Sequence, residues 1–417
     1  MEKIGKLKNI MLSNKKIIEN YSFMTVLQVL NSFFYFIIFP YLINTLGKEN
    51  YGLFVFATSI MSYFILIMNY GFDVPAIKEV AKNKENKEKL SEIVSSIFTA
   101  KNYLYGVNVL IFLGLLFFIP IFSQNKILFI SCFILVYKDI IFPQWFFQGV
   151  QEMKLVTFIQ LGCKLISLPL IFLFVKIPTD LPVFSIIVTL TTLFGGSFAF
   201  FLLQKRYGVI VRIATIDKIK PWFKEGAHFF YSLLFVSIKD YSVPVIIGTF
   251  LGMKDVAIYD LASKLVAVPR LLSANINRVI FPKLIVKIKN QMVKKIIRFE
   301  TIGALIVMLL IIFLGKYLVL FLGGEDMDGA YYLSILLSFT IMSWMLVGAY
   351  TYFVFIPNNV NYLLTRNQFL SLISYFVFVA IGLLIYKNIL ILGAAIAFSA
   401  LIELIYCYFA IKKHKLL

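Results

Sequence analysis

Histidine, cysteine and acidic residues are all scarce in this chain of 417 residues. There are two histidines, three cysteines, and 21 acidic residues against 40 lysines and arginines. Cys132, Cys163 and Cys407 lie inside apolar stretches without metal-ligand spacing. We therefore expect neither a disulfide framework nor a Cys- or His-based metal site. The formal net charge of +19 would suggest a nucleic-acid partner for a soluble protein, but its meaning depends on where the charges lie.

Charged residues of both signs are few, at 15%, whereas hydrophobic residues make up 60% and the mean hydropathy is +0.89. A soluble domain cannot bury that much apolar surface, because a compact core needs a largely polar skin. A bilayer can solvate it. We expect no cleavable signal, because residues 1–20 are charged and lead into a full-length apolar span.

Long apolar runs fill most of the chain, and a spanning helix needs roughly 20 mainly apolar residues. Such runs lie at 21–46, 51–72, 92–121, 125–148, 155–176, 181–204, 224–251, 256–282, 299–322, 331–356, 367–386 and 388–411. The sequence therefore predicts an all-α membrane protein with about twelve transmembrane helices.

Lysine and arginine are divided unevenly between alternate connections of these spans. Twenty-seven lie on one side, in 3–16, 78–89, 205–224, 283–298 and 412–415 together with Lys154 and Arg366. Only five lie on the other, namely Lys48, Lys126, Lys176, Lys254 and Lys387. Because cytoplasmic loops are rich in Lys and Arg, we expect both termini in the cytoplasm. This bias explains most of the positive charge without a nucleic-acid partner.

An internal repeat relates the two halves of the chain. Residues 46–54 (LGKENYGLF) and 251–259 (LGMKDVAIY) each join a pair of spans, 205 positions apart. Six spans separate the copies, so the halves share an orientation, which is the pattern of parallel repeats. We expect two pseudo-symmetric six-helix lobes around a central cavity.

The predicted division of the chain follows from these spans. It comprises a cytoplasmic N-terminal segment at 1–20, an N-lobe at 21–204, a basic cytoplasmic linker at 205–223, a C-lobe at 224–411 and a cytoplasmic tail at 412–417. The outer connections are short, and no Gly-rich nucleotide-binding loop is present. These features favour a transporter without catalytic residues over a membrane enzyme such as a glycan polymerase.

Eight basic residues lie within or at the ends of the predicted spans, and all but Arg278 and Lys316, which are near helix ends, lie deeper, where a charge costs about 2.5–3.5 kcal/mol even on a gentle insertion scale. The deeper bases are Lys101, Lys138, Lys164, Lys239, Lys264 and Arg270. Several such charges would not face lipid, so we expect them to line a wet cavity and bind an anionic headgroup, especially a diphosphate. The alternative is structural, with Lys–Asp pairs that fix helix packing.

Four acidic residues accompany these bases, namely Asp139, Asp240, Asp260 and Glu403. Asp260 and Lys264 have the i,i+4 spacing of a pair on one helix face, whereas Asp139 and Asp240 each directly follow a lysine and point about 100° away from it. These acids are candidates for charge pairing or for coupling to a proton or sodium gradient. No other cofactor is expected.

Three segments of the sequence resemble the O-antigen and capsular polysaccharide flippases (Wzx-type), within the superfamily that includes multidrug and toxin extruders. The segment 69–81 (NYGFDVPAIKEVA) is similar to the family's Gly-Phe…Arg-Glu-Ile-Ala pattern, with Lys78 where Arg is usual. The segment 145–153 (WFFQGVQEM) is similar to its Gln-Gly…Glu-Met pattern. The segment 257–265 (AIYDLASKL), followed by Phe281-Pro282-Lys283-Leu284, matches its eighth span, although Gly is commoner than Asp260.

This resemblance implies a function and a location. The protein is expected to move an undecaprenyl-diphosphate-linked repeat unit across the bacterial cytoplasmic membrane by alternating access, with glycan polymerase and chain-length machinery as candidate partners. The alternative is a cation-coupled multidrug exporter of the same fold. The scarcity of acids in the first span and the excess of deep bases favour the flippase.

Overall fold

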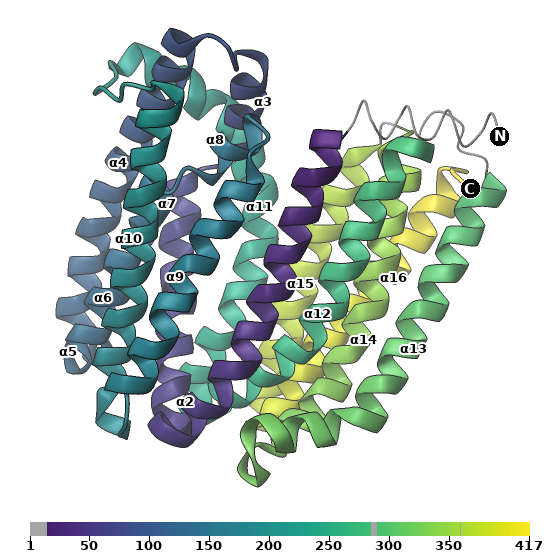
Figure 1. Cartoon of the computed structure of the whole chain (residues 1–417). Coiled ribbons are helices and arrows are strands. Elements are labelled where there is room, and N and C mark those ends of the chain that lie inside the picture. Colours follow the sequence, from purple (N-terminus) through teal and green to yellow (C-terminus); the bar gives the residue numbers. More distant parts are fainter. Residues whose placement is uncertain (1–14, 285–289, 359) are drawn as a thin grey trace. The chain divides into compact units, whose positions relative to one another are not determined.

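The computed structural model describes residues 15–284, 290–358 and 360–417, and every regular element within those ranges is helical (Figure 1). The chain divides into two compact units, here called unit 1 and unit 2. Unit 1 holds the chain up to Phe34 together with Ala57–Leu234. Unit 2 holds Tyr35–Phe56 together with Phe235–Leu417.

Two long helices run through both units, namely α2 (Lys15–Asn69) and α11 (Ile216–Phe250). Unit 1 also contains α3 (Asp73–Lys82), α4 (Lys87–Phe118), α5 (Pro120–Gln124), α6 (Lys126–Val136), α7 (Lys138–Ile141), α8 (Gln144–Gly149), α9 (Met153–Phe174), the 3-10 turn η1 (Pro178–Asp180) and α10 (Leu181–Tyr207). Unit 2 also contains α12 (Met253–Leu284), α13 (Asn290–Gly323), the 3-10 turn η3 (Glu325–Met327), α14 (Gly329–Tyr350), the π-turn η4 (Thr351–Phe355), α15 (Asn361–Ile385) and α16 (Ile389–Lys413).

The predicted fold class is confirmed. Ten helical segments of the described chain are long and apolar enough to cross a membrane. The first of them contains two helices that meet at Gly47, where the backbone leaves helical geometry. The charged helix α12 is not among the ten, but its 32 residues span about 48 Å at 1.5 Å per residue. Counting α2 as two helices and adding α12 gives the twelve that the sequence predicted.

The fourth predicted span, 125–148, is broken into three pieces. Helix α6 ends at Val136, α7 covers a single turn, and α8 begins after Pro143. Proline has no N–H to continue the helical hydrogen bonds, and residue 142 adopts a non-helical backbone before it. Lys138 and Asp139 therefore lie on the short middle piece, halfway along the span.

Several helices begin earlier than hydropathy suggested. Helix α11 starts at Ile216 rather than 224, and α13 starts at Asn290 rather than 299. The connection between the second and third spans contains the helix α3. These extra turns each contain two lysines, and lysine is a good helix former although it is poorly soluble in hydrocarbon. Hydropathy therefore locates the apolar part of a helix better than its ends.

The two Leu-Gly turns of the repeat have matching geometry, which supports the internal repeat. Gly47 and Gly252, which are equivalent positions, both have positive φ, at 77° and 117°. In unit 2 the two turns also meet, because a Cβ on Gly52 would lie 1.8 Å from the carbonyl oxygen of Met253. A glycine at position 52 is therefore required for this close approach.

An extended segment, 208–215, joins α10 to α11 within unit 1 and lies along α4. The backbone N–H groups of Ile210, Arg212 and Ala214 donate to the hydroxyls of Ser91, Ser95 and Thr99, at 3.1, 3.0 and 3.0 Å. Alternate residues of an extended chain thus bind hydroxyls spaced four residues apart on a helix. We call this arrangement the hydroxyl ladder.

Candidate functional site

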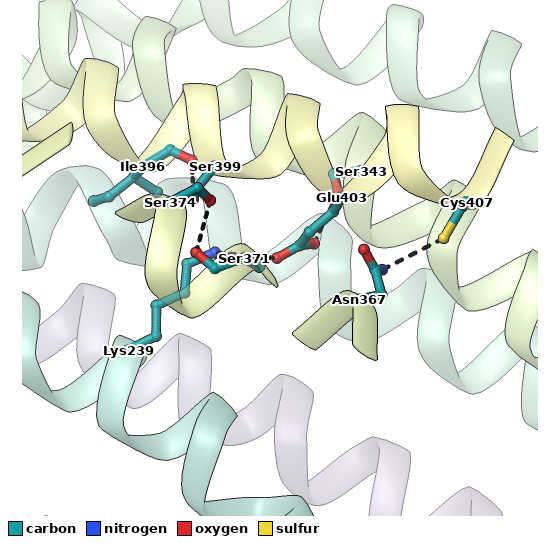
Figure 2. A network of polar contacts seen from close by, with 9 residues as sticks. All are labelled: Lys239, Ser343, Asn367, Ser371, Ser374, Ile396, Ser399, Glu403 and Cys407. Atoms are coloured by element: carbon teal, nitrogen blue, oxygen red, sulfur yellow. Dashed lines mark hydrogen bonds and ion pairs between the residues drawn. The ribbon is translucent and has the colours of Figure 1, made fainter. Parts of the chain in front are cut away.

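A network of polar side chains lies inside unit 2, where four helices converge (Figure 2). The Lys239 ammonium on α11 lies 3.1 Å from Glu403 Oε1 on α16 and donates to Ser371 Oγ on α15 at 2.7 Å. The Ser371 hydroxyl in turn donates to the same carboxylate oxygen. Ser343 on α14 donates to Glu403 Oε2 at 3.1 Å. We call these four residues the Lys239 network.

The charges of the Lys239 network are largely withdrawn from solvent. The side chains of Lys239 and Glu403 are each 15% exposed, and Ser343 is fully buried. A buried charge requires a partner and further hydrogen bonds to offset its lost hydration, and the two serines provide them. The pairing could not be read from the sequence, because 164 residues separate the two charged groups.

An amide side chain lies next to this network. Asn367 on α15 is 1% exposed, and its Nδ2 contacts Cys407 Sγ at 3.4 Å. Its Oδ1 has no hydrogen-bond partner among the described residues and is turned away from Cys407 (Figure 2). A buried carbonyl oxygen of this kind lacks the hydrogen-bond partner that such groups usually have in folded proteins.

A cavity of about 390 Å³ adjoins the Lys239 network, and we call it the unit 2 cavity. Its polar lining comprises Lys239, Asp240, Arg270, Thr351, Tyr352, Asn367, Gln368, Ser371 and Glu403, with Trp344 among the apolar groups. The Arg270 guanidinium lies over the Trp344 ring, 3.8 Å from its centroid. This close cation–π contact limits the movement of the guanidinium.

Asp260 on α12 is held by two tyrosines of α2 within unit 2. Its Oδ2 accepts hydrogen bonds from the hydroxyls of Tyr51 at 2.7 Å and Tyr35 at 3.0 Å. Lys264 Nζ lies 4.0 Å from Asp260 Oδ1, so the predicted i,i+4 pair forms only at its outer limit. Asp260 is 8% exposed, whereas the Lys264 side chain is 48% exposed. The tyrosines therefore contribute the shorter contacts to this carboxylate.

A second cavity, of about 330 Å³, lies in unit 1 beside the broken fourth span, and we call it the unit 1 cavity. Its polar lining comprises Asn31, Lys138, Asp139, Gln144, Gln160, Lys164 and Thr192. Lys164 also lies over the Phe34 ring, 5.2 Å from its centroid. Both lysines sit near the middle of spans, since α9 runs from Met153 to Phe174 and the fourth span from Lys126 to Gly149.

Lys101 on α4 is placed differently from the other predicted bases. It is 2% exposed, and its Nζ lies 3.1 Å from Asp73 Oδ1 and 3.4 Å from the backbone carbonyl of Asp139. This is the geometry of a packing contact that ties α4 to α3 and α7. A buried base held in this way is less available to a ligand than a base at a cavity wall.

The structure thus sorts the predicted residues into separate places. Lys138, Lys164 and Asp139 share the unit 1 cavity, and Lys239, Arg270, Asp240 and Glu403 share the unit 2 cavity. Asp260 with Lys264, and Lys101 with Asp73, form two further pairs. Sequence reasoning missed the uncharged partners Ser343, Ser371, Asn367 and Trp344. Serines and asparagines within apolar spans are the available signal for them, because such groups need partners in hydrocarbon.

A family comparison gives this geometry its context. Residues 17–289 match the model of a protein family described as "Polysaccharide biosynthesis protein". The chain belongs to this family. The resemblance to a polysaccharide family noted from the sequence motifs is confirmed.

Two relatives of the chain carry the name "Putative O-antigen transporter". One, from Escherichia coli K12, is 25% identical over 265 residues, which is 64% of this chain and 64% of that relative's length. The other, from Shigella dysenteriae, is 27% identical over 332 residues, covering 76% of this chain and 83% of the relative.

Solved structures share the fold at low sequence identity. A lipid II flippase, MurJ, in an inward closed conformation is 14% identical, with a TM-score of 0.70 over 93% of this chain and 87% of that one. An outward-facing multidrug transporter of the MATE family is also 14% identical, with a TM-score of 0.58 over 96% of this chain and 95% of that one. The chain therefore has the fold common to these two groups of transporters.

Proposed function

We propose that this protein is a flippase that moves a lipid-linked oligosaccharide repeat unit, carried on undecaprenyl diphosphate, across the bacterial cytoplasmic membrane. The observation that carries the proposal is a cavity lined by two lysines at mid-span in a polysaccharide biosynthesis protein. The names of the relatives and the shared fold support the same direction.

The physical need for such a protein lies in the substrate headgroup. Each unpaired polar group costs several kcal/mol in hydrocarbon, and a sugar carries many hydroxyls. A cavity with mid-membrane lysines offsets the loss of hydration of the diphosphate, because charge-assisted hydrogen bonds strengthen in a low-dielectric surrounding. The lipid tail needs no such site and remains in the bilayer.

Lys138 and Lys164 are the residues proposed to bind the diphosphate. Both line the unit 1 cavity, and Lys138 lies on the interrupted span. Interrupted helices recur at substrate sites of transporters, because their free backbone groups and turn residues face a wet cavity. Access is proposed to alternate between the two faces of the membrane, as in other transporters built from repeats.

The decisive experiment uses the purified full chain in proteoliposomes with the lipid-linked repeat unit extracted from a native strain that lacks this protein. Wild-type protein is expected to expose the inner-leaflet repeat to an external glycosidase, while protein-free vesicles do not. Lys138→Gln and Lys164→Gln should each slow this exposure at least tenfold, and Lys205→Gln, at the exposed end of α10, should not. Equal rates with and without protein would refute the proposal.

Gradient coupling is a proposal that the same vesicles can test. The candidate acids are Asp139, Asp240, Asp260 and Glu403, of which Asp240 is exposed to a cavity. Flipping that is faster with an imposed proton or sodium gradient would support coupling. Rates that are indifferent to both gradients would remove it.

The competing function is export of cationic drugs, since multidrug transporters share the fold. A cationic substrate requires an excess of acid, whereas Glu403 is paired with Lys239, and the cavities lined by Asp240 and Asp139 each hold two bases. Deletion in the native host separates the two functions. Accumulation of lipid-linked repeat units supports the flippase, and drug sensitivity with normal surface glycan supports the exporter.

The remaining parts of the proposal concern location and partners. We propose that the chain lies in the cytoplasmic membrane with both termini inside, because of the distribution of Lys and Arg. We further propose that a glycan polymerase and chain-length machinery use its product on the outer face, because a flipped repeat unit needs an enzyme there to join it to others.

A further inference from the structure

The two cavities differ in their charge balance. The unit 2 cavity is lined by two bases, Lys239 and Arg270, and by two acids, Asp240 and Glu403. The unit 1 cavity is lined by Lys138 and Lys164 against the single acid Asp139. An anion is therefore attracted by the net charge of the unit 1 cavity, while the unit 2 cavity offers no net charge to it.

The bases of the unit 2 cavity are also poorly arranged for phosphate. Lys239 is already bonded to Glu403 and Ser371, so only one of its three N–H donors is left for a phosphate. A phosphate that displaced the carboxylate would leave Glu403 charged and unpaired in a largely buried place, which is costly. Asp240, exposed at the same cavity, would repel an incoming phosphate.

The unit 2 cavity instead presents both hydrogen-bond donors and hydrogen-bond acceptors. Arg270 lies over the Trp344 ring and offers several N–H donors. Asp240 offers acceptors at the cavity wall, and Asn367, which also lines the cavity, has a buried Oδ1 without a hydrogen-bond partner among the described residues. Sugar hydroxyls both donate and accept hydrogen bonds, so they suit a lining of this mixed kind better than an acceptor-only phosphate does. The volume of about 390 Å³ falls in the usual range of small-molecule sites, roughly 300–1,000 Å³.

We propose that the unit 2 cavity is a carbohydrate subsite, which binds the hydroxyl-rich sugar part of the substrate and not its diphosphate. This inference rests on the proposed flippase function and refines it. In this assignment Arg270, Asp240 and Asn367 bind sugar hydroxyls. The Lys239 network fixes four of the helices that line the cavity, namely α11, α14, α15 and α16.

The test measures two affinities of the full chain in lipid nanodiscs. The first ligand is farnesyl diphosphate, which carries the anionic group without any sugar. The second is the lipid-linked repeat unit extracted from a native strain lacking this protein. Arg270→Gln and Asn367→Leu are expected to weaken binding of the repeat unit about tenfold and to leave farnesyl diphosphate binding within twofold. Lys138→Gln should weaken both, and Lys316→Gln, on the exposed face of α13, should weaken neither.

Each outcome separates the inference from the function on which it rests. If Arg270→Gln weakens both ligands equally, the unit 2 cavity binds the diphosphate and the inference is wrong. If Arg270→Gln and Asn367→Leu fold, as judged by thermal unfolding, and weaken neither ligand, the cavity is not a subsite. If the wild-type chain binds neither ligand, the flippase proposal itself fails.

Discussion

The effect of replacing a charged residue inside these spans depends on the charge with which it is paired. Glu403 and Lys239 offset one another in a largely buried setting, so neither is tolerated alone. Removing one partner of a buried pair typically costs about 3–5 kcal/mol, whereas replacing both by apolar groups of similar size is often neutral. Comparing single and double substitutions of Lys239 and Glu403 can therefore show whether the pair matters for stability or for transport.

Glu403→Ala is predicted to lower the stability of the folded protein by about 3 kcal/mol, because it leaves Lys239 charged with Ser371 as its one remaining partner within the Lys239 network. The lower end of the range applies since the adjoining cavity admits water. Thermal unfolding in detergent measures the effect. The double variant Lys239→Met with Glu403→Leu should recover most of the loss, and Lys316→Ala should cause none. A double variant less stable than Glu403→Ala would contradict this account.

Tyr51→Phe is predicted to cost about 1.5 kcal/mol, because it removes the 2.7 Å hydrogen bond to the buried Asp260 carboxylate. Hydrogen bonds to charged groups contribute about 1.5–3 kcal/mol in soluble proteins, while those in membrane proteins average about 0.6 with a maximum near 1.7. Tyr332→Phe, whose side chain is largely exposed, is the matched control. Equal unfolding temperatures for Tyr51→Phe and wild type would show that Tyr35 alone holds the carboxylate.

Sequence reasoning worked unevenly at this scale. It located the charged residues within the predicted spans, because a Lys or Asp in an apolar run is visible without a structure. It found the partner of Asp260 four residues away but not its two tyrosines, which lie 209 and 225 residues distant. Long-range pairing depends on how helices pack, and apolar composition alone does not determine that.

Breaks in helices are the informative feature at the level of elements. Gly47 has φ 77° and ψ 163°, a conformation almost confined to glycine, and it divides α2 into two helices. The fourth span is interrupted on both sides of α7. The sequence predicted the first break, because separate apolar spans lie at 21–46 and 51–72, but it did not predict the breaks around α7 within the single apolar run 125–148.

Gly47→Ala is predicted to destabilise the protein by about 1–3 kcal/mol through backbone strain alone, since no atom lies within 4 Å of the added Cβ. Gly162→Ala provides the control. It lies within α9 with equally open space, and alanine favours a helix by about 1 kcal/mol over glycine. Denaturation of the two variants in the same detergent should therefore shift in opposite directions. A shift in the same direction would mean that strain at Gly47 is not the cause.

At the scale of the whole molecule, the repeat predicted from the sequence reappears in the backbone of the two Leu-Gly turns. The equivalent residues Gly47 and Gly252 both have positive φ, so the two turns are similar in backbone conformation as well as in sequence. The number of spans was predictable because apolar length is a local property. The composition of the compact units was not predicted, because residues 35–56 group with the second half of the chain.

The predicted orientation can be checked by labelling. In a chain whose three cysteines are replaced by serine, Lys126→Cys should react with a membrane-impermeant maleimide in cells with a permeable outer layer and an intact cytoplasmic membrane. Lys413→Cys should react only after the cytoplasmic membrane is opened. Both positions are exposed, so failure to react reflects sidedness rather than burial. The reverse pattern would invert the topology.

The hydroxyl ladder fixes the length of the connection between α10 and α11. Two residues of extended chain advance about 6.6 Å, and four residues of helix advance about 6 Å, so each rung meets the next hydroxyl. Inserting one glycine after Val209 should therefore misplace every following N–H and lower stability, whereas inserting two should restore alternate pairing, as thermal unfolding would show. Helix α11 has 35 residues and continues without a break from unit 1 into unit 2. A change in the length of the connection would therefore displace the whole helix, because the helix contains no loop that could compensate for it.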